Sequence, residues 1–231
     1  EDKYYVDKTM YLPKMEAAGN FLFLIRPRRF GKSLFLSMMR CYYDINEMDN
    51  FGSLFSGLWI EKNPTPLMGT FQVLYLDFSQ VGGDMNNLFD RFNSRTGAVL
   101  DGFARRYERF YYEGFAKDVE SKSDFRSKLD IVTIRAREFG HHLYLIVDEY
   151  DNFTNTVLNV AGEEVYHAMT HAEGFYRDVF KLFKPNFDRI LMMGVSPVTM
   201  DDVTSGYNIA TSLTLDPDFN MMLGFSETEV R

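Results

Sequence analysis

Four short apolar segments recur along the chain and divide it into a regular pattern. They span residues 21–25, 73–77, 143–147 and 190–195. Each is short and continuous and is bounded by polar or turn-forming residues, which is typical of a strand buried on both faces. Longer stretches with helical spacing separate them. We therefore expect an α/β fold whose mainly parallel central sheet is covered by helices on both faces.

Helical periodicity is clearest directly after the first apolar segment. From Gly31 to Tyr43, apolar side chains recur three and four positions apart, which predicts an amphipathic helix. Residues 85–139 are also mostly helical in pattern, with breaks near Gly114 and at 121–123. The other expectations are irregular connection over 44–70, a loop from 151 that becomes helical at 173–183, and a long ordered loop after Pro197.

The loop between the first apolar segment and this helix carries the first candidate chemistry. It reads Arg26-Pro27-Arg28-Arg29-Phe30-Gly31-Lys32-Ser33. A P-loop reads G-x-x-x-x-G-K-[ST] between a strand and a helix, so Gly31, Lys32 and Ser33 match. The N–H groups that open a helix lack intrahelical partners and bind phosphate oxygens. We expect Lys32 to contact the β- and γ-phosphates and Ser33 to give its hydroxyl to Mg²⁺.

The residues around this motif complete the predicted nucleotide-binding set. Arg28 and Arg29 raise the local positive charge, which favours a triphosphate or an acidic partner. The alternative is that these arginines face solvent or pair with carboxylates of an acidic protein. Phe30 and Leu34 flank the motif on either side. Arg26 stands where the motif has its first glycine, which suggests a differently bent loop entrance.

The third apolar segment ends in two adjacent carboxylates, Asp148 and Glu149. Strand carboxyl ends of a parallel sheet point into the ligand crevice. We expect Asp148 to hold Mg²⁺, directly or through water, and Glu149 to orient and activate the attacking water. The alternative is a surface Asp-Glu pair that begins a turn, and the five preceding apolar residues count against it. We interpret Asp151 as loop chemistry or a helix cap.

Other residues are candidates for supporting roles. Ser196 follows the fourth segment and either contacts the γ-phosphate or the attacking water, or is a turn residue before Pro197. Asp77 ends the second segment in the same manner. The pair at His167 and His171 has metal-binding spacing, but we find no H-E-x-x-H motif and assign no metal role. Either Tyr4 and Tyr5 stack on adenine, or they pack at the sheet edge.

Composition narrows the function classes. The net charge of −8 argues against a broad polyanion-binding face, although a small basic pocket remains compatible with it. Aromatic residues make up 16% of the chain, which we interpret as a phenylalanine-rich core rather than as platforms for single-stranded nucleic acid. Cys41 is the single cysteine, so no intrachain disulfide forms. No apolar run of about 18 residues predicts a membrane span, and we expect a cytoplasmic protein.

Several segments together resemble a known family. They are Tyr5-Val6-Asp7-Lys8-Thr9, the loop from Arg26 to Leu34, Val147-Asp148-Glu149-Tyr150-Asp151, Gly194-Val195-Ser196-Pro197, the run from Thr204 to Thr211, and Leu223-Gly224-Phe225-Ser226. This sequence is similar to the predicted AAA-ATPase-like proteins of bacteria, over nearly the whole chain. The resemblance implies a P-loop fold of the additional-strand, catalytic-glutamate type, in which the fourth strand inserts between the loop strand and the Asp148-Glu149 strand. It also implies that Arg26 is a family feature.

The combined expectation is a three-layer P-loop NTPase domain over residues 1–231 that binds ATP and Mg²⁺ and hydrolyses ATP. Ser226 and Glu229 resemble a capping box at the start of a helix, which suggests that the protein continues. The resemblance implies a following domain like the PD-(D/E)XK nucleases, and through it a nucleic-acid partner. A homo-oligomer would let a second copy supply an arginine. The alternatives are a non-hydrolysing nucleotide switch and a nucleic-acid-binding module.

Overall fold

The computed structural model describes residues 5–79, 88–170, 175–196 and 210–230. In these ranges the strands are β1 Phe21–Ile25, β2 Phe71–Asp77, β3 His142–Asp148, β4 Arg189–Gly194 and β5 Thr211–Ser212. The helices are α1 Tyr11–Ala18, α2 Lys32–Tyr43, α3 Phe51–Leu54, α4 Trp59–Lys62, α5 Leu88–Tyr107, α6 Phe115–Glu120, α7 Phe125–Glu138, α8 Asn152–Ala161, α9 Glu163–Thr170, α10 Phe175–Phe183 and α12 Glu227–Val230, with 3₁₀ turns η1 Ile45–Asn50, η3 Glu108–Phe110 and η4 Pro217–Phe219.

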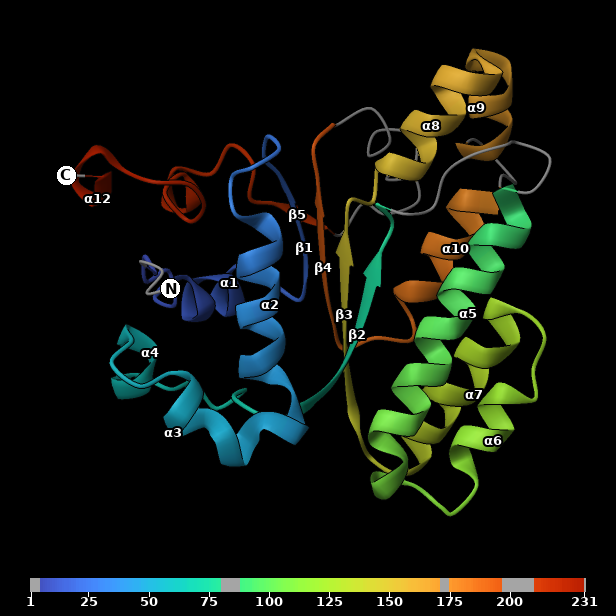
Figure 1. Cartoon of the computed structure of the whole chain (residues 1–231), viewed down its shortest axis with the longest axis horizontal. Coiled ribbons are helices and arrows are strands. Elements are labelled where there is room, and N and C mark those ends of the chain that lie inside the picture. Colours follow the sequence, from blue (N-terminus) through green and yellow to red (C-terminus); the bar gives the residue numbers. More distant parts are fainter. Residues whose placement is uncertain (1–4, 80–87, 171–174, 197–209, 231) are drawn as a thin grey trace.

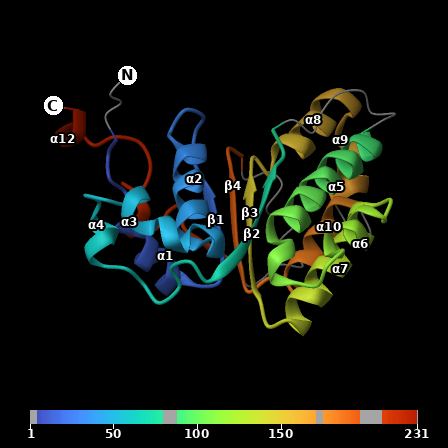
Figure 2. The same cartoon turned by 60° about the horizontal axis from the view of Figure 1, so that its bottom comes forward.

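The sheet has the strand order β2-β3-β4-β1-β5, and every pair of neighbouring strands is parallel. Helices α1 to α4 lie on one side of the sheet, and α5, α6, α7 and α10 lie on the other (Figures 1 and 2). Helices α8 and α9 lie beyond the carboxyl ends of the strands, on the α5 side (Figure 1). The expected three-layer α/β architecture is confirmed.

Side chains alternate across the buried strands, which explains why the strand segments are apolar throughout. On β3, Leu145 and Val147 join the core beneath α5 and α7, whereas Tyr144 and Ile146 join the core beneath α2. Neighbouring strands follow the same alternation because side chains point to opposite faces with a period of two. Asp148 therefore belongs to the α2 side of the sheet.

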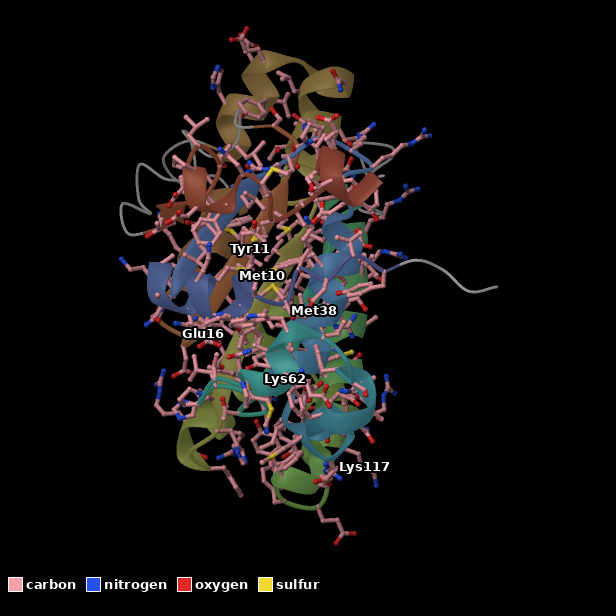
Figure 3. All side chains as sticks on the ribbon, turned by 90° about the vertical axis from the view of Figure 1, so that its left-hand side faces the viewer. Met10, Tyr11, Glu16, Met38, Lys62 and Lys117 are labelled. Carbon is pink, nitrogen blue, oxygen red and sulfur yellow. The ribbon has the colours of Figure 1, made fainter. Side chains whose placement is uncertain are left out.

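The α2 side of the sheet is covered by α1, α2 and the short helices of the 45–62 region, and Figure 3 views this layer from outside. Glu16 of α1 links parts of the layer, since its Oε1 accepts hydrogen bonds from the Tyr43 hydroxyl at 3.0 Å and from the Thr65 hydroxyl at 2.7 Å. The layer thus fixes α2, whose first turn faces the carboxyl ends of the strands.

The four predicted strands are confirmed, with small differences at their ends. β2 begins at Phe71, two residues before the predicted start, and β4 ends at Gly194. The order of the strands also agrees with the family resemblance, because β4 lies between β1 and β3. Helix α2 forms where periodicity predicted it, and helix α12 begins after Ser226.

Other sequence expectations were wrong. Residues 152–170 form α8 and α9 instead of a loop, because Val157 and Tyr166 are buried and tertiary packing overrides the weak helix propensity of the Asn- and Thr-rich sequence. The 44–70 region contains η1, α3 and α4. Residues 211–212 pair with β1 as β5, within the segment expected to be a loop. None of the described helices is long and apolar enough to cross a membrane.

Candidate nucleotide site

The loop between β1 and α2 has a backbone that only certain residues adopt easily. Arg29 has φ of 66° and Gly31 has φ of 84°, so both lie in the left-handed region. Gly31 occupies the N-cap position of α2, and no described side chain caps this helix. The first intrahelical bond runs from the Phe35 N–H to the Gly31 carbonyl. The opening N–H groups of α2 are therefore directed out of the helix, which is the arrangement that binds anions.

The first turn of α2 contacts the end of β3 through two side chains. The Ser33 hydroxyl donates to Asp148 Oδ2 at 2.9 Å. Asp148 is 3% exposed, and its other oxygen, Oδ1, accepts from the Glu149 N–H at 3.0 Å. The hydroxyl and the carboxylate that the sequence predicted as magnesium ligands, 115 positions apart, are therefore adjacent in space.

Lys32 is buried and is held by the loop itself. Its ammonium donates to the Arg26 carbonyl at 3.0 Å and to the Pro27 carbonyl at 2.9 Å. Burial lowers the pKa of Lys32, while the charges of Asp148 and Glu149 act in the opposite direction. The ammonium therefore lies inside the loop and in the field of the acidic end of β3.

Glu149 leaves the strand with an unusual backbone conformation. Its φ is 51°, which is rare for a residue with a side chain. Burial raises the pKa of the Glu149 carboxyl, and the charges of Asp148 and Asp77 raise it further. Arg28 and Lys32 of the loop oppose this shift in the pKa. The sharp turn at Glu149 thus keeps both carboxyl groups of the Asp-Glu pair close to the loop.

For Asp151 the sequence left two alternatives, loop chemistry or a helix cap, and the cap is wrong. It stands at the N-cap position of α8, but its side chain makes no cap bond there. Instead the carboxylate, only 2% exposed, accepts from the Ser196 N–H at 2.6 Å and from the Val195 N–H at 3.2 Å. Asp151 also accepts from the Asn155 side-chain amide at 3.2 Å. It therefore joins the loop after β3 to the end of β4.

Gly194 makes this close approach between the two strand ends feasible. A Cβ atom at this position would lie 2.4 Å from the Tyr150 ring and 2.6 Å from Asp151 Oδ1. The Tyr150 hydroxyl in turn donates to the Ser196 carbonyl at 2.9 Å. Both the N–H and the carbonyl of Ser196 are therefore held by hydrogen bonds. A glycine at the end of the fourth apolar segment was the available sequence signal for this contact.

The Arg26 side chain contacts the C-terminal segment, residues 210–230. Its guanidinium donates to the carbonyls of Ile25 and Thr214, both at 2.9 Å, and to the Phe219 carbonyl at 3.2 Å. Its N–H continues the β1–β4 ladder by donating to the Gly194 carbonyl. The residue in place of the first motif glycine therefore ties the loop to the C-terminal segment.

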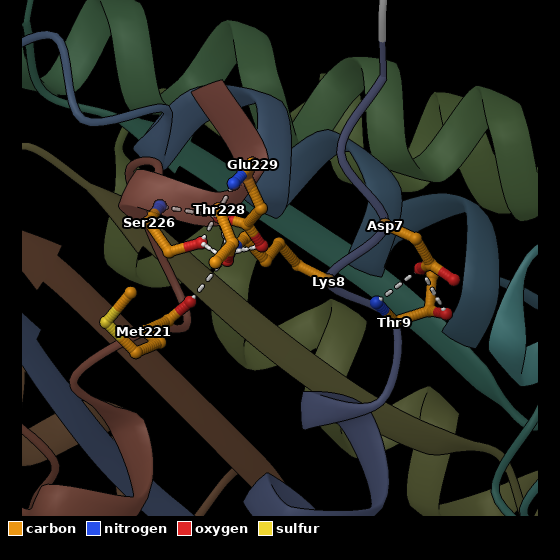
Figure 4. A network of polar contacts seen from close by, with 7 residues as sticks. All are labelled: Asp7, Lys8, Thr9, Met221, Ser226, Thr228 and Glu229. Carbon is orange, nitrogen blue, oxygen red and sulfur yellow. Dashed lines mark hydrogen bonds and ion pairs between the residues drawn. The ribbon is translucent and has the colours of Figure 1, made fainter. Parts of the chain in front are cut away.

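The two ends of the described chain meet beside the loop. The Lys8 ammonium contacts Glu229 Oε1 at 2.8 Å and Oε2 at 3.0 Å, and donates to the Met221 carbonyl at 2.9 Å (Figure 4). The Lys8 contact, followed by the Ser226 N–H, lowers the pKa of Glu229 to about 2. Ser226 and Glu229 form the predicted capping box, because each accepts the other's N–H. The Gly224 N–H also donates to the Phe30 carbonyl at 3.0 Å.

A mostly apolar cavity of about 220 Å³ opens where these segments meet. It is lined by Tyr5, Val6, Lys8, Arg29, Phe30, Gly31, Leu34, Phe35, Met222, Leu223, Gly224 and Phe225. The predicted nucleotide-binding residues Phe30 and Leu34 are thus brought to its wall, where they are 43% and 61% exposed. Tyr5 also lines it, whereas Tyr4 lies outside the described residues.

The comparison with known families decides where the chain belongs. The sequence model of the family described as Predicted AAA-ATPase matches residues 1–204. The chain belongs to this family. An uncharacterised protein from the vnfD 5′ region of Azotobacter chroococcum mcd 1 is 24% identical over 240 residues, and the match covers the whole chain but 41% of that protein. No solved structure matches.

The remaining candidate site residues of this member of the Predicted AAA-ATPase family are less closely connected to the loop. Arg28 and Arg29 are exposed. Asp77 is the register neighbour of Asp148, and its carboxylate accepts the Ser79 N–H at 2.8 Å. His167 contacts Glu163 at 3.4 Å, and its predicted partner His171 lies outside the described residues, as do Pro197 and Thr204. The described part of the chain has no group of three or more His, Cys, Asp or Glu side chains suited to a metal ion.

Mg²⁺ bound together with a nucleotide needs fewer than three protein side chains, and Ser33 and Asp148 fit this requirement. Mg²⁺ prefers hard oxygen ligands and keeps several waters, so one or two protein oxygens suffice beside substrate phosphates. A serine hydroxyl and a buried carboxylate whose oxygens lie 2.9 Å apart form such a pair. Ser33 lies in the opening turn of α2 and Asp148 at the end of β3 beside it, where a polyphosphate would supply the remaining oxygens.

Proposed function

We propose that this chain binds ATP with Mg²⁺ at the start of α2 and hydrolyses it. The observation that carries the proposal is the 2.9 Å contact between Ser33 and Asp148, directly beside a loop that holds a buried lysine. Membership of the Predicted AAA-ATPase family supports nucleotide binding. The position of β4 between β1 and β3 supports the P-loop topology.

In the proposed complex, the N–H groups from Gly31 to Leu34 and the Lys32 ammonium bind the β- and γ-phosphates. Lys32 now donates to two loop carbonyls, so phosphate oxygens would replace one or both of these acceptors. Ser33 and Asp148 would hold Mg²⁺, which neutralises phosphate charge when bound. Arg28 and Arg29 would add positive charge at the exposed rim of the loop.

Glu149 is the proposed base for hydrolysis. Its raised pKa makes it a stronger proton acceptor than an ordinary glutamate, and a general base works best when its pKa approaches the working pH. Ser196, whose backbone Asp151 and Tyr150 position, would contact the γ-phosphate or the attacking water. Catalysis would then rest on positioning and on electrostatic stabilisation without a covalent intermediate.

The apolar cavity beside Gly31 would receive the nucleotide base. Its wall combines flat aromatic rings and aliphatic side chains, such as Phe30 and Leu34, which suit the faces of a purine. Tyr5 and Phe225 contribute further aromatic surface from the two ends of the described chain. Binding there would place the phosphates over the opening turn of α2.

Calorimetry with a non-hydrolysable Mg·ATP analogue tests binding, and phosphate release from ATP tests hydrolysis. We expect Lys32→Ala to abolish detectable binding, and Lys62→Ala on the exposed face of α4 to leave it unchanged. Glu149→Gln should bind the analogue normally but lose about 100-fold or more in turnover, as expected for removal of a general base. Glu113→Gln, an exposed change of the same chemistry, is its matched control. Absence of magnesium-dependent binding by the native chain would refute the proposal.

The non-hydrolysing switch remains the second candidate, because bonds from Arg26 and Phe30 connect the loop to the C-terminal segment. We propose that residues 1–231 form one ATPase domain, whose nucleotide state acts on a nuclease-like effector in a longer protein. Normal binding of the analogue with no phosphate release by the native chain would favour the switch. A nucleic-acid-binding role would instead appear as affinity that falls steeply with salt.

A further inference from the structure

The end of β2 contributes a residue to the Ser33–Asp148 contact that the sequence did not indicate. The Tyr75 hydroxyl donates to Asp148 Oδ2 at 3.0 Å. This is the same oxygen that accepts from the Ser33 hydroxyl at 2.9 Å. Tyr75 reaches it because β2 and β3 pair in parallel, with Asp77 opposite Asp148, and because Tyr75 packs against the core on the α2 side.

The tyrosine side chain is itself held in place from α2. The Arg40 guanidinium lies over its ring, 4.7 Å from the ring centroid. A tyrosine hydroxyl has an ordinary pKa of about 10. It is therefore protonated at neutral pH and donates to the Asp148 carboxylate. Arg40, Tyr75 and Asp148 form a continuous chain of contacts from the surface of α2 to the end of β3.

Magnesium binding would change the two hydroxyl groups that donate to Asp148 Oδ2 in different ways. The Ser33 hydroxyl is itself a proposed ligand, so its oxygen would turn towards the ion. Tyr75 is not a proposed ligand, so its hydroxyl would keep its hydrogen bond to the Asp148 carboxylate. A fixed hydrogen bond to a metal-binding carboxylate restricts its orientation and lowers the entropy lost on binding.

We propose that Tyr75 is a positioning residue that orients the Asp148 carboxylate and so sets the affinity of the site for a divalent cation. This inference rests on the proposed function, because it requires Asp148 to bind magnesium. Hydrogen-bond partners of metal ligands are typically worth 10- to 100-fold in metal affinity. We expect the Tyr75 hydroxyl to contribute about 10-fold, because the Glu149 N–H also holds Asp148.

The test is Tyr75→Phe, which removes the hydroxyl and keeps the ring under Arg40. Mn²⁺ replaces Mg²⁺ as a spectroscopic probe, and electron paramagnetic resonance measures its affinity for the complex of the protein with ADP. We expect about 10-fold weaker Mn²⁺ binding, with ADP affinity in EDTA unchanged. Turnover should recover at high Mg²⁺ concentration, which a general structural defect would not allow.

The matched control is Tyr112→Phe. The Tyr112 hydroxyl also donates to a carboxylate, Asp118 Oδ2, at 2.6 Å, but on the surface between η3 and α6. It should leave Mn²⁺ affinity unchanged. Arg40→Ala should give an intermediate loss of Mn²⁺ affinity, because the ring keeps its hydroxyl but loses its support. Thermal melting of each variant identifies any that fails to fold.

The outcomes separate this inference from the proposed function. Mn²⁺ affinity of Tyr75→Phe equal to that of the native chain would overturn the positioning role while leaving ATP binding intact. Equal losses of ADP affinity with and without the cation would also overturn it, since they would indicate a structural effect. If the native protein with ADP does not bind Mn²⁺, the magnesium site itself is wrong and the positioning role of Tyr75 falls with it.

Discussion

Asp151→Asn tests the connection between the ends of β3 and β4. The carboxylate receives hydrogen bonds from the N–H groups of Val195 and Ser196 and from the Asn155 side chain, and is 2% exposed. The asparagine amide has one acceptor oxygen in place of two. It also places an NH₂ group where a backbone N–H now points. At least one buried donor is therefore left without an acceptor.

The size of the effect follows from these bonds. A buried donor without a partner costs about 1–3 kcal/mol, and a lost bond to a charged acceptor costs a similar amount. Removing the buried charge recovers part of this, because the asparagine has a smaller desolvation penalty. We expect a net loss of about 2–4 kcal/mol in the free energy of unfolding.

Urea unfolding monitored by far-ultraviolet circular dichroism measures this loss. Asp188→Asn is the matched control, because Asp188 accepts the Leu143 N–H at 2.8 Å near the start of β3, but its side chain is 46% exposed. We expect the control to cost less than about 1 kcal/mol, since water can replace the lost acceptor. Equal losses for Asp151→Asn and Asp188→Asn would refute the reasoning that burial makes Asp151 important.

Four further changes test other parts of the site. Gly194→Ala should lower the free energy of unfolding by about 3 kcal/mol in urea unfolding, because its Cβ would overlap the Tyr150 ring. Arg26→Gly should cost about 2–3 kcal/mol in thermal melts through its lost carbonyl contacts, and a stability equal to that of the native chain would contradict their role. The pKa of Glu149 is raised in the folded chain, so its carboxyl contributes to the free energy of unfolding at low pH, where it is protonated. This contribution is lost as the pH rises above about 4.5 and through the folded pKa. Glu149→Gln should therefore have a higher free energy of unfolding than the native chain at pH 7. The pKa of Glu229 is lowered to about 2, so its ionised carboxylate contributes to the free energy of unfolding above about pH 4.5. This contribution is lost as the pH falls towards 2. Glu229→Gln should therefore flatten that part of an acid-unfolding profile.

The central fold could be predicted from the sequence because its strands are buried on both faces. Such strands are continuously apolar, and the polar residues that follow them mark the carboxyl edge of the sheet. The same logic located Asp148 and Glu149. The Gly31-Lys32-Ser33 motif located Ser33, and the structure places its hydroxyl beside Asp148. The helices over 152–170 could not be predicted in this way, since their stability comes from burying Val157 and Tyr166 against other elements.

The supporting residues of the site were missed for a related reason. Asp151, Tyr75 and Arg26 each act through a partner between 44 and 193 positions away along the chain. No local periodicity or motif reports such a pairing, because a motif describes residues that are close in sequence. The tertiary fold brings these side chains to their partners, through strand register for Tyr75 and through the chain that follows β5 for Arg26.

Arg26 shows how this chain departs from an ordinary phosphate loop. A glycine at the loop entrance gives freedom to the backbone, whereas Arg26 anchors the entrance to the carbonyls of Thr214 and Phe219. The Phe30 carbonyl accepts the Gly224 N–H, so the other end of the loop is anchored to the same segment. The family match ends at residue 204, whereas the three residues that anchor the loop, Thr214, Phe219 and Gly224, lie after that position. The shape of the candidate phosphate site therefore depends on the C-terminal segment as well as on the motif itself.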